Sequence, residues 1–215
     1  MKYWSEFKSH LSRIMQEALP GFEAQMKMVP ESSIAARLKV PTVVKESSVL
    51  CLLYPSELNQ SVQVLMIERS HDGGKHSGQI AFPGGKYESE DGSLLATAQR
   101  ETMEEVGLLA EQYQIVGAMT NIYVPVSNYV IHPYLAVADT LDIAMLQGSE
   151  DEVKTVLSIP LKGLFESRTM TMVNSYASPQ VKNWEVPAYI FEQEYVIWGA
   201  SAMILSELEA IIQKM

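Results

Sequence analysis

The sequence predicts an α/β (α+β) fold, a single domain built around a mixed β-sheet. Short apolar runs between turn residues alternate with segments in which apolar residues recur at helical spacing. The pattern is helical near both ends of the chain and alternates between strand and helix in the middle. With 215 residues, 47% of them hydrophobic and 20% charged, the chain is long enough for one core of ordinary size.

The chain is expected to open with a helix over residues 4–19, which Pro20 and Gly21 then end. Residues 21–46 are expected to be irregular, apart from a segment over 34–38 whose state the pattern leaves open. The apolar residues of the first helix recur at helical spacing; they are Trp4, Phe7, Leu11, Met15 and Leu19.

Strands are expected where β-branched and aromatic residues gather between turn residues. These segments are 48–54, 62–69, 79–82, 113–120, 129–138, 155–159, 169–173 and 189–195. Residues 121–128 are expected to form a loop, 160–165 a short helix, and the segment from Ser201 onward an amphipathic helix.

Composition excludes several classes of protein. The net charge of −10 argues against nonspecific binding to nucleic acid or to an anionic membrane. Cys51 is the only cysteine, so no intrachain disulfide can form, and its apolar surroundings predict a buried side chain. We see neither an apolar signal segment nor a run of about 18 apolar residues, and we expect a cytoplasmic protein.

The stretch 84–108, GGKYESEDGSLLATAQRETMEEVGL, carries the chemistry. Glu101, Glu104 and Glu105 are spaced so that a helix would stack them on one face. Like charges this close raise one another's pKa, so a cation is expected among them. A hard divalent ion such as Mg²⁺ prefers carboxylate oxygens and keeps water and phosphate oxygens as its other ligands. For the three glutamates alone, a solvated acidic face is the alternative.

The helix that carries these glutamates has recognisable ends. Asp91 and Ser93 are candidates for its N-cap, and Gly107 stands where a glycine ends a helix. Before the helix, Pro83, Gly84 and Gly85 form a loop whose backbone can approach an anionic ligand. The inward-facing stripe is expected on a different face from the carboxylates; it comprises Leu95, Ala98, Thr102 and Val106.

This stretch resembles the Nudix box, in which a glycine, a glutamate and an Arg-Glu-x-x-Glu-Glu-x-Gly run follow at set intervals. Asp91 stands at the position of the first glutamate, eight residues before Arg100 rather than seven, and Thr102 replaces an apolar residue. The resemblance implies a Nudix hydrolase domain over 47–215, after a lead-in segment 1–46, with the sheet sandwiched between helices. The matching residues are Gly85, Arg100, Glu101, Glu104, Glu105, Gly107 and Leu108.

The resemblance also implies hydrolysis of a pyrophosphate bond with Mg²⁺ or Mn²⁺. Glu101 and Glu105 are then the metal ligands, and Glu104 is a third ligand or holds water. Arg100 completes the catalytic set by orienting a carboxylate. The resemblance leaves open which glutamate acts as a base.

A second motif lies before the box. Arg69-Ser70, Gly78 and the run 82–85 resemble the motif that precedes the box in Nudix coenzyme A pyrophosphatases, although Gly74 replaces its second arginine. Lys75 and His76 follow and could supply the missing positive charge. The substrate would be coenzyme A, cleaved to 4'-phosphopantetheine and adenosine 3',5'-bisphosphate. The implied substrate contacts are Arg69, Lys75, His76, Gly84 and Gly85.

Alternatives remain open at this point. The substrate could be another nucleoside diphosphate derivative: ADP-ribose, a dinucleotide or a noncanonical nucleoside triphosphate. A binding module without catalysis is a third reading, which the intact carboxylates oppose. The family and the apolar terminal helices predict a homodimer. We expect His132 and Trp198 in the core and Tyr123 and Tyr129 in packing or adenine stacking. The acidic run 150–152 is expected in solvent, at a helix N-cap or over the site.

Overall fold

A mixed sheet of eight strands forms the centre of the protein, with strand order β3-β2-β1-β7-β5. The computed structural model describes residues 2–56, 61–70, 76–149, 151–175 and 182–215. The three remaining strands pair with this path: β4 with β1, β6 with β7, and β8 with β2. The strands are β1 (Lys45–Pro55), β2 (Val62–Arg69), β3 (Ile80–Ala81), β4 (Gly84–Lys86), β5 (Gln114–Ala118), β6 (Ile122–Val124), β7 (Tyr129–Val137) and β8 (Val153–Pro160).

The register makes the sheet mixed, as predicted. Strands β1 and β7 run parallel from the pair Lys45 and Tyr129 to the pair Leu53 and Val137. The other pairings in this sheet are antiparallel. The loop expected over 121–128 contains the short strand β6, so that expectation is wrong in part.

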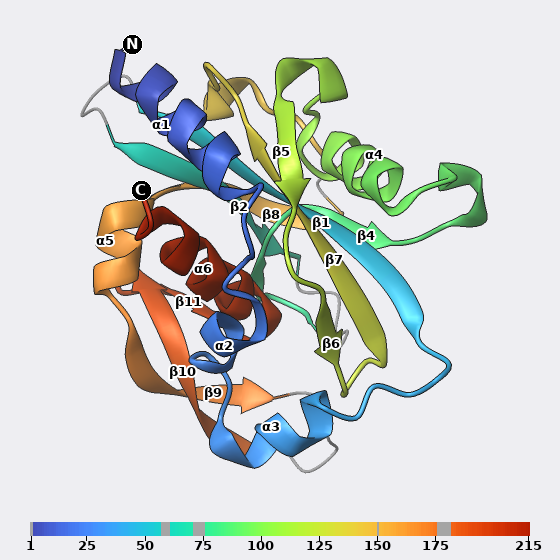
Figure 1. Cartoon of the computed structure of the whole chain (residues 1–215). Helices are drawn as coiled ribbons and strands as arrows, with labels where there is room; N and C mark the ends of the chain where they lie inside the picture. The colour runs from blue at the N-terminus through green and yellow to red at the C-terminus, as the bar shows by residue number, and fades with distance from the viewer. Residues whose placement is uncertain (1, 57–60, 71–75, 150, 176–181) are drawn as a thin grey trace.

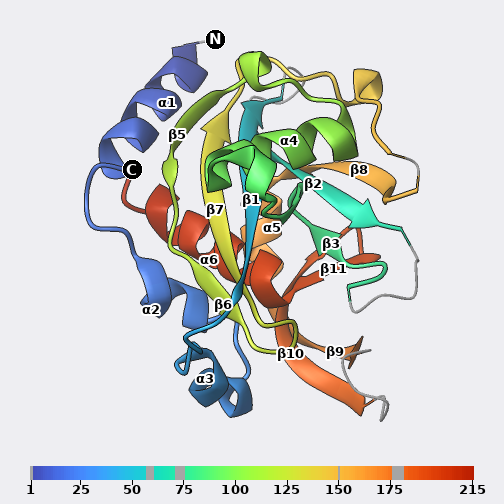
Figure 2. The same cartoon turned by 90° about the vertical axis from the view of Figure 1, so that its right-hand side faces the viewer.

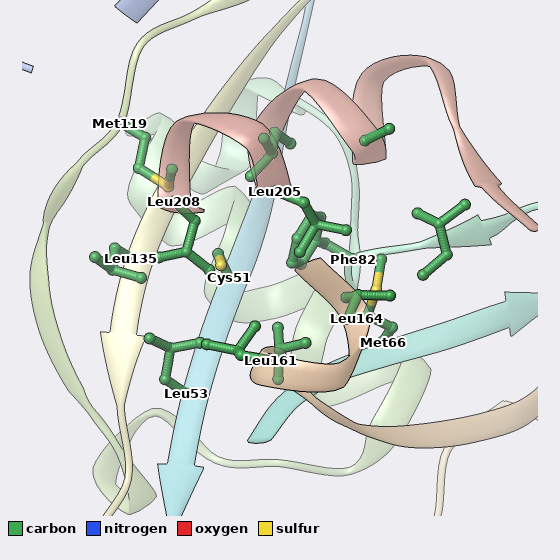
Figure 3. Packing of buried hydrophobic residues seen from close by; sticks show 14 of the residues in the cluster. Cys51, Leu53, Met66, Phe82, Met119, Leu135, Leu161, Leu164, Leu205 and Leu208 are labelled. Atoms are coloured by element: carbon green, nitrogen blue, oxygen red, sulfur yellow. The ribbon is translucent and has the colours of Figure 1, made fainter. Parts of the chain in front are cut away.

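Helices cover both faces of the sheet (Figure 1). On one face, the carboxylate-bearing helix α4 (Leu94–Val106) packs its Val106 against Leu50 and Leu52 of β1. On the other face, Cys51 and Leu53 pack with residues of α6 (Gly199–Ile212) such as Leu208 (Figure 3). Alternation along β1 produces this division. The expectations of a sandwiched sheet and of a buried Cys51 are confirmed.

A second sheet lies beside the first. It consists of the antiparallel strands β9 (Thr169–Ser175), β10 (Lys182–Phe191) and β11 (Tyr195–Trp198), with β10 in the centre. The single strand expected over 189–195 is therefore wrong, because the chain reverses between β10 and β11. Glu192 and Gln193 make that turn with φ of 51° and 60°. Neither is a glycine or asparagine, so the usual sequence signal for a left-handed turn is missing.

The N-terminal region contains more helix than expected. The first helix, α1 (Lys2–Ile14), ends earlier than residue 19, and residues 21–46 contain α2 (Gly21–Met26) and α3 (Glu31–Arg37). Helices of six or seven residues are too short to show a clear apolar period. The short helix expected over 160–165 is confirmed as α5 (Leu161–Glu166).

A buried carboxylate ties the two ends of the chain together. Glu207 of α6 is fully buried and accepts hydrogen bonds from the Gly21 amide (3.2 Å) and the Gln25 side chain (3.0 Å) of α2. It also accepts from the Thr120 amide (3.3 Å) and hydroxyl (2.6 Å) after β5. A buried carboxylate needs several such donors to compensate for lost hydration. This network joins α2, α6 and the main sheet.

None of the helices in the described parts of the chain has the length and apolar character needed to cross a membrane.

Candidate active site

Helix α4 begins and ends where the sequence predicts. The Ser93 hydroxyl accepts a hydrogen bond from the Ala96 amide at 3.1 Å and so forms the N-cap. Gly107 ends the helix with a φ of 72°. Asp91 is not a cap of this helix, because it belongs to the preceding 3₁₀ turn, Ser89–Asp91. Thr102 occupies a buried position by donating its hydroxyl to the Ala98 carbonyl at 2.6 Å.

Glu105 lies inside the protein, with only 1% of its surface exposed. The expectation that all three carboxylates avoid the buried face is therefore wrong for this residue. One carboxylate oxygen accepts from the Gly84 amide at 2.8 Å, and the other accepts from Arg69 Nη1 at 2.9 Å. Burial raises the pKa of Glu105 to about 7, against the opposing effect of these two donors. Glu105 is thus a buried carboxylate whose orientation is fixed at both oxygens.

Glu101 lies one turn earlier, with 14% of its side chain exposed. Burial raises its pKa, the neighbouring Arg100 lowers it, and the charges of Glu104 and Glu152 raise it further. Gly85 lies directly against this carboxylate: a Cβ atom added there would be 2.3 Å from Glu101 Oε1. A side chain at position 85 would therefore displace Glu101.

Arg100 forms the centre of an ion-pair cluster on the outer side of α4. It donates to both Asp91 oxygens, at 2.7 and 3.1 Å. Its Nη1 atom donates to Glu101 at 3.0 Å and to Glu104 at 2.9 Å. The guanidinium holds the pKa of Asp91 well below its usual range. Asp91, despite its departure from the Nudix pattern, fixes the arginine that contacts two of the three glutamates.

The residues predicted to contact substrate lie in different surroundings. Arg69 and Gly84 meet at Glu105, and Gly85 adjoins Glu101. His76 is exposed, with Nδ1 3.0 Å from the Gln79 side-chain oxygen. Lys75 lies outside the described residues.

Other residues that the sequence singled out have structural partners. The Glu152 carbonyl accepts from the Ser70 amide at 2.9 Å, which brings the end of the acidic run next to the site; Glu150 lies outside the described residues.

His132 is only partly buried and pairs with Glu46 at 2.6 Å, so the expectation of a core histidine is wrong. Trp198 is also only partly buried, contrary to expectation. The Tyr123 hydroxyl donates to Asn128 at 3.1 Å, and the Lys45 amine lies over the Tyr129 ring.

A loop that the sequence analysis missed closes the C-terminal end of α4. The Ser149 amide donates to the Glu104 carbonyl at 3.1 Å. A Cβ added to Gly148 would lie 1.8 Å from the Glu105 carbonyl oxygen, and one added to Gly107 would meet the Gln147 carbonyl. Gly107 and Gly148 are the sequence signal that could have indicated this loop, because only glycine allows two backbone segments to approach so closely.

The donor chemistry of the site suits a hard divalent cation. Glu101 and Glu105 offer carboxylate oxygens, and burial raises the pKa of each, so a cation bound beside them would favour their charged forms. Among the residues that the structure describes, no three His, Cys, Asp or Glu side chains are grouped closely enough to hold a metal as they stand. The glutamates are instead engaged by Arg69 and Arg100.

A sheet between helices, with paired glycines beside a carboxylate-bearing helix, defines the class of protein. The chain belongs to the Nudix family: the NUDIX domain model matches residues 44–187. It is a hydrolase that acts on pyrophosphate bonds, in a family whose members generally depend on divalent metal.

Curated relatives agree with this assignment. The chain is 30% identical over 145 residues to the uncharacterised Nudix hydrolase NudL of Citrobacter koseri, covering 67% of this chain and 72% of that protein. It is 30% identical over 131 residues to the human mitochondrial coenzyme A diphosphatase NUDT8, covering 61% of this chain but only 54% of that protein.

Solved structures show the same fold. An Ap4A hydrolase of C. elegans matches with a TM-score of 0.52 at 15% identity, over 80% of this chain and 100% of that chain. A MutT/nudix family protein of Enterococcus faecalis matches with a TM-score of 0.53 at 19% identity, over 97% of this chain and 74% of that chain.

Proposed function

We propose that this protein hydrolyses the pyrophosphate bond of coenzyme A or its derivatives, giving 4'-phosphopantetheine and adenosine 3',5'-bisphosphate. The observation that carries the proposal is the meeting of the two ends of the pre-box motif at one carboxylate. Arg69 begins that motif and Gly84 stands near its end, and they bind the two oxygens of Glu105. The motif that resembles coenzyme A pyrophosphatases is therefore built into the carboxylate site. The similarity to the human coenzyme A diphosphatase supports the same substrate.

In this proposal Glu101 and Glu105, with Glu104, hold Mg²⁺ or Mn²⁺. The bound ion supplies positive charge to the phosphate oxygens and lowers the pKa of water. The chain's own residues position the ligands: the Gly84 amide and Arg69 orient Glu105, and Arg100 orients Glu101 and Glu104. Arginine suits this task because its planar guanidinium offers several fixed donors.

The remaining assignments are proposals of the same kind. Lys75 and His76 would supply the positive charge that the motif lacks here, because Gly74 stands in place of its second arginine. Glu152 would act as a carboxylate near the site from outside the box, since its charge already raises the pKa of Glu101. The homodimer and the cytoplasmic setting stay predictions.

Product analysis tests the proposal. The purified protein, with Mg²⁺ or with Mn²⁺, is given coenzyme A, ADP-ribose, NADH and nucleoside triphosphates separately, and a metal-free sample serves as a blank. We expect metal-dependent release of adenosine 3',5'-bisphosphate from coenzyme A. A Glu105→Gln sample, purified in the same way, controls for contaminating hydrolases. Cleavage of another substrate with coenzyme A left intact would refute the substrate assignment while leaving the pyrophosphohydrolase class in place.

A further inference from the structure

A cavity of about 310 Å³ lies between the second sheet and the residues that lead into β3; we call it the side cavity. Strands β3 and β11 run close together here (Figure 2). The volume is at the lower end of the range for small-molecule sites. Residues from both sheets line it, among them Glu68, Gln79, Met172, Glu194, Tyr195 and Trp198.

The side cavity and the carboxylate site share one strand as a wall. The register of β2 with β8 shifts between Glu68 and Arg69, so the contacts of these two residues show where each side chain lies. The Arg69 side chain reaches Glu105, whereas Glu68 lines the side cavity and stands opposite Ile80 of β3. The Arg69 amide also donates to the Gln79 carbonyl at 3.1 Å. The side cavity and the carboxylate site therefore lie on opposite faces of the sheet at the C-terminal end of β2, where the strand is paired with both β3 and β8. A substrate that extends past this end of the strand would have its pyrophosphate at the carboxylates and one arm in the cavity.

The charge of the described lining residues disfavours the phosphate-bearing end of such a substrate. Two carboxylates, Glu68 and Glu194, line the cavity, and none of the described residues that line it is Lys, Arg or His. Lys154 donates to Glu68 at 2.7 Å, whereas Glu194 is exposed in the turn before β11. A 3'-phosphate would therefore meet net negative charge, which disfavours its binding.

The rest of the lining suits an uncharged chain with amide groups. Tyr195, Trp198 and Met172 offer apolar surface, and Gln79 and Asn174 carry amide groups that can both donate and accept hydrogen bonds. An apolar wall with a few polar groups is typical of sites for small organic ligands.

We propose that the side cavity binds the uncharged, amide-bearing pantetheine arm of the substrate, and that the 3'-phosphorylated nucleotide end lies outside it. This inference rests on the proposed function, because it names the place of one half of coenzyme A.

Two methionines of β9 offer a matched test. Met172 lines the cavity and is 57% exposed; Met170 lies two residues away on the same face of the strand, is 53% exposed and does not line it. Because both side chains are so exposed, Met172→Glu and Met170→Glu should both fold, which a thermal melt verifies. Only Met172→Glu adds a third carboxylate to the cavity wall.

The measurements are the KM for coenzyme A and inhibition by each product separately. For Met172→Glu we expect KM to rise about tenfold and inhibition by 4'-phosphopantetheine to weaken equally, because binding of the arm would remove water from the new carboxylate. Inhibition by adenosine 3',5'-bisphosphate should stay unchanged, and Met170→Glu should behave like the unaltered protein.

The outcomes separate the two proposals. If the unaltered protein does not cleave coenzyme A, the proposed function itself fails. If it does, but Met172→Glu leaves KM unchanged or weakens only adenosine 3',5'-bisphosphate, the assignment of the cavity is overturned and the function stands.

Discussion

Replacing Gly85 with alanine tests whether this glycine exists to make room for Glu101. Gly85 is not among the residues with positive φ, so alanine is compatible with the backbone there. The added methyl group would lie 2.3 Å from both Oε1 and the carboxyl carbon of Glu101. The clash involves the end of a flexible side chain, so the carboxylate is expected to move while the fold remains.

The size of the effect follows from this geometry. To restore ordinary van der Waals separation, the carboxylate must retreat by about 1 Å. A displacement of about 1 Å in a positioned catalytic group lowers the rate about 100-fold. We therefore expect kcat/KM of Gly85→Ala to fall about 100-fold, with less than about 1 kcal/mol change in the free energy of unfolding.

Two other glycines provide matched controls. At Gly148 the added methyl would lie 1.8 Å from the backbone oxygen of Glu105, which cannot move without disturbing α4. Gly148→Ala is therefore expected to lose stability. At Gly163, in helix α5, nothing lies within 4 Å of the added atom. Gly163→Ala should keep full activity and gain up to about 1 kcal/mol of stability, because alanine favours helix more than glycine does.

The assay measures kcat/KM on the best substrate from the product analysis, and urea unfolding followed by circular dichroism gives the stability of all three variants. Unaltered kcat/KM in Gly85→Ala would refute the proposed positioning of Glu101. Unfolding of Gly85→Ala as severe as that of Gly148→Ala would show that the glycine serves the fold instead.

Four further predictions concern buried or paired carboxylates. Glu105→Gln should abolish turnover while the circular dichroism spectrum stays unchanged; an active variant would contradict the metal-ligand assignment. The pKa of Glu105 rises from 4.5 to about 7 on folding, so the metal-free folded protein holds an extra proton between these values. Its stability should fall by on the order of 3 kcal/mol as pH rises across this window, a slope that thermal melts should no longer show in Glu105→Gln. The depressed pKa of Asp91 has the opposite sign: its stabilisation is complete above about pH 4 and is lost on further acidification. Melts of Asp91→Asn should therefore be less sensitive to acid below pH 4, and an unchanged acid slope would contradict this. Glu207→Gln should cost about 1–3 kcal/mol in urea unfolding, since it leaves a buried donor unpaired; Glu23→Gln, which removes an exposed charge from the same region, is the control and should unfold like the unaltered protein.

The sequence predicted those features that depend on local pattern. Helix α4, its Ser93 cap and its Gly107 end follow from residue types whose preference is fixed within one turn. The apolar runs of β1 and β2, bounded by turn residues, likewise predicted strands. The list of glutamates at the site came from spacing and family resemblance together.

The features that the sequence did not predict depend on contacts between distant segments. Glu105 lies in an acidic run that favours solvent, and it is buried because Arg69 and Gly84 reach it from other strands. Glu207 lies in a helix expected to be amphipathic, but α2 covers its polar face. Periodicity along one segment contains no information on which neighbour will cover it.

The Glu207 network has a consequence for the borders of the family domain. The matched region spans residues 44–187, whereas Glu207 and its partners Gly21 and Gln25 all lie beyond it. A protein cut at those borders would lose the whole of α6 and expose the apolar face that Cys51 and Leu53 present to it. Thr120, inside the borders, would lose its acceptor. The smallest part of this enzyme that we expect to fold on its own therefore includes the segments on both sides of the matched region. A chimera that exchanges one of these segments must also exchange the other, because Glu207 joins them.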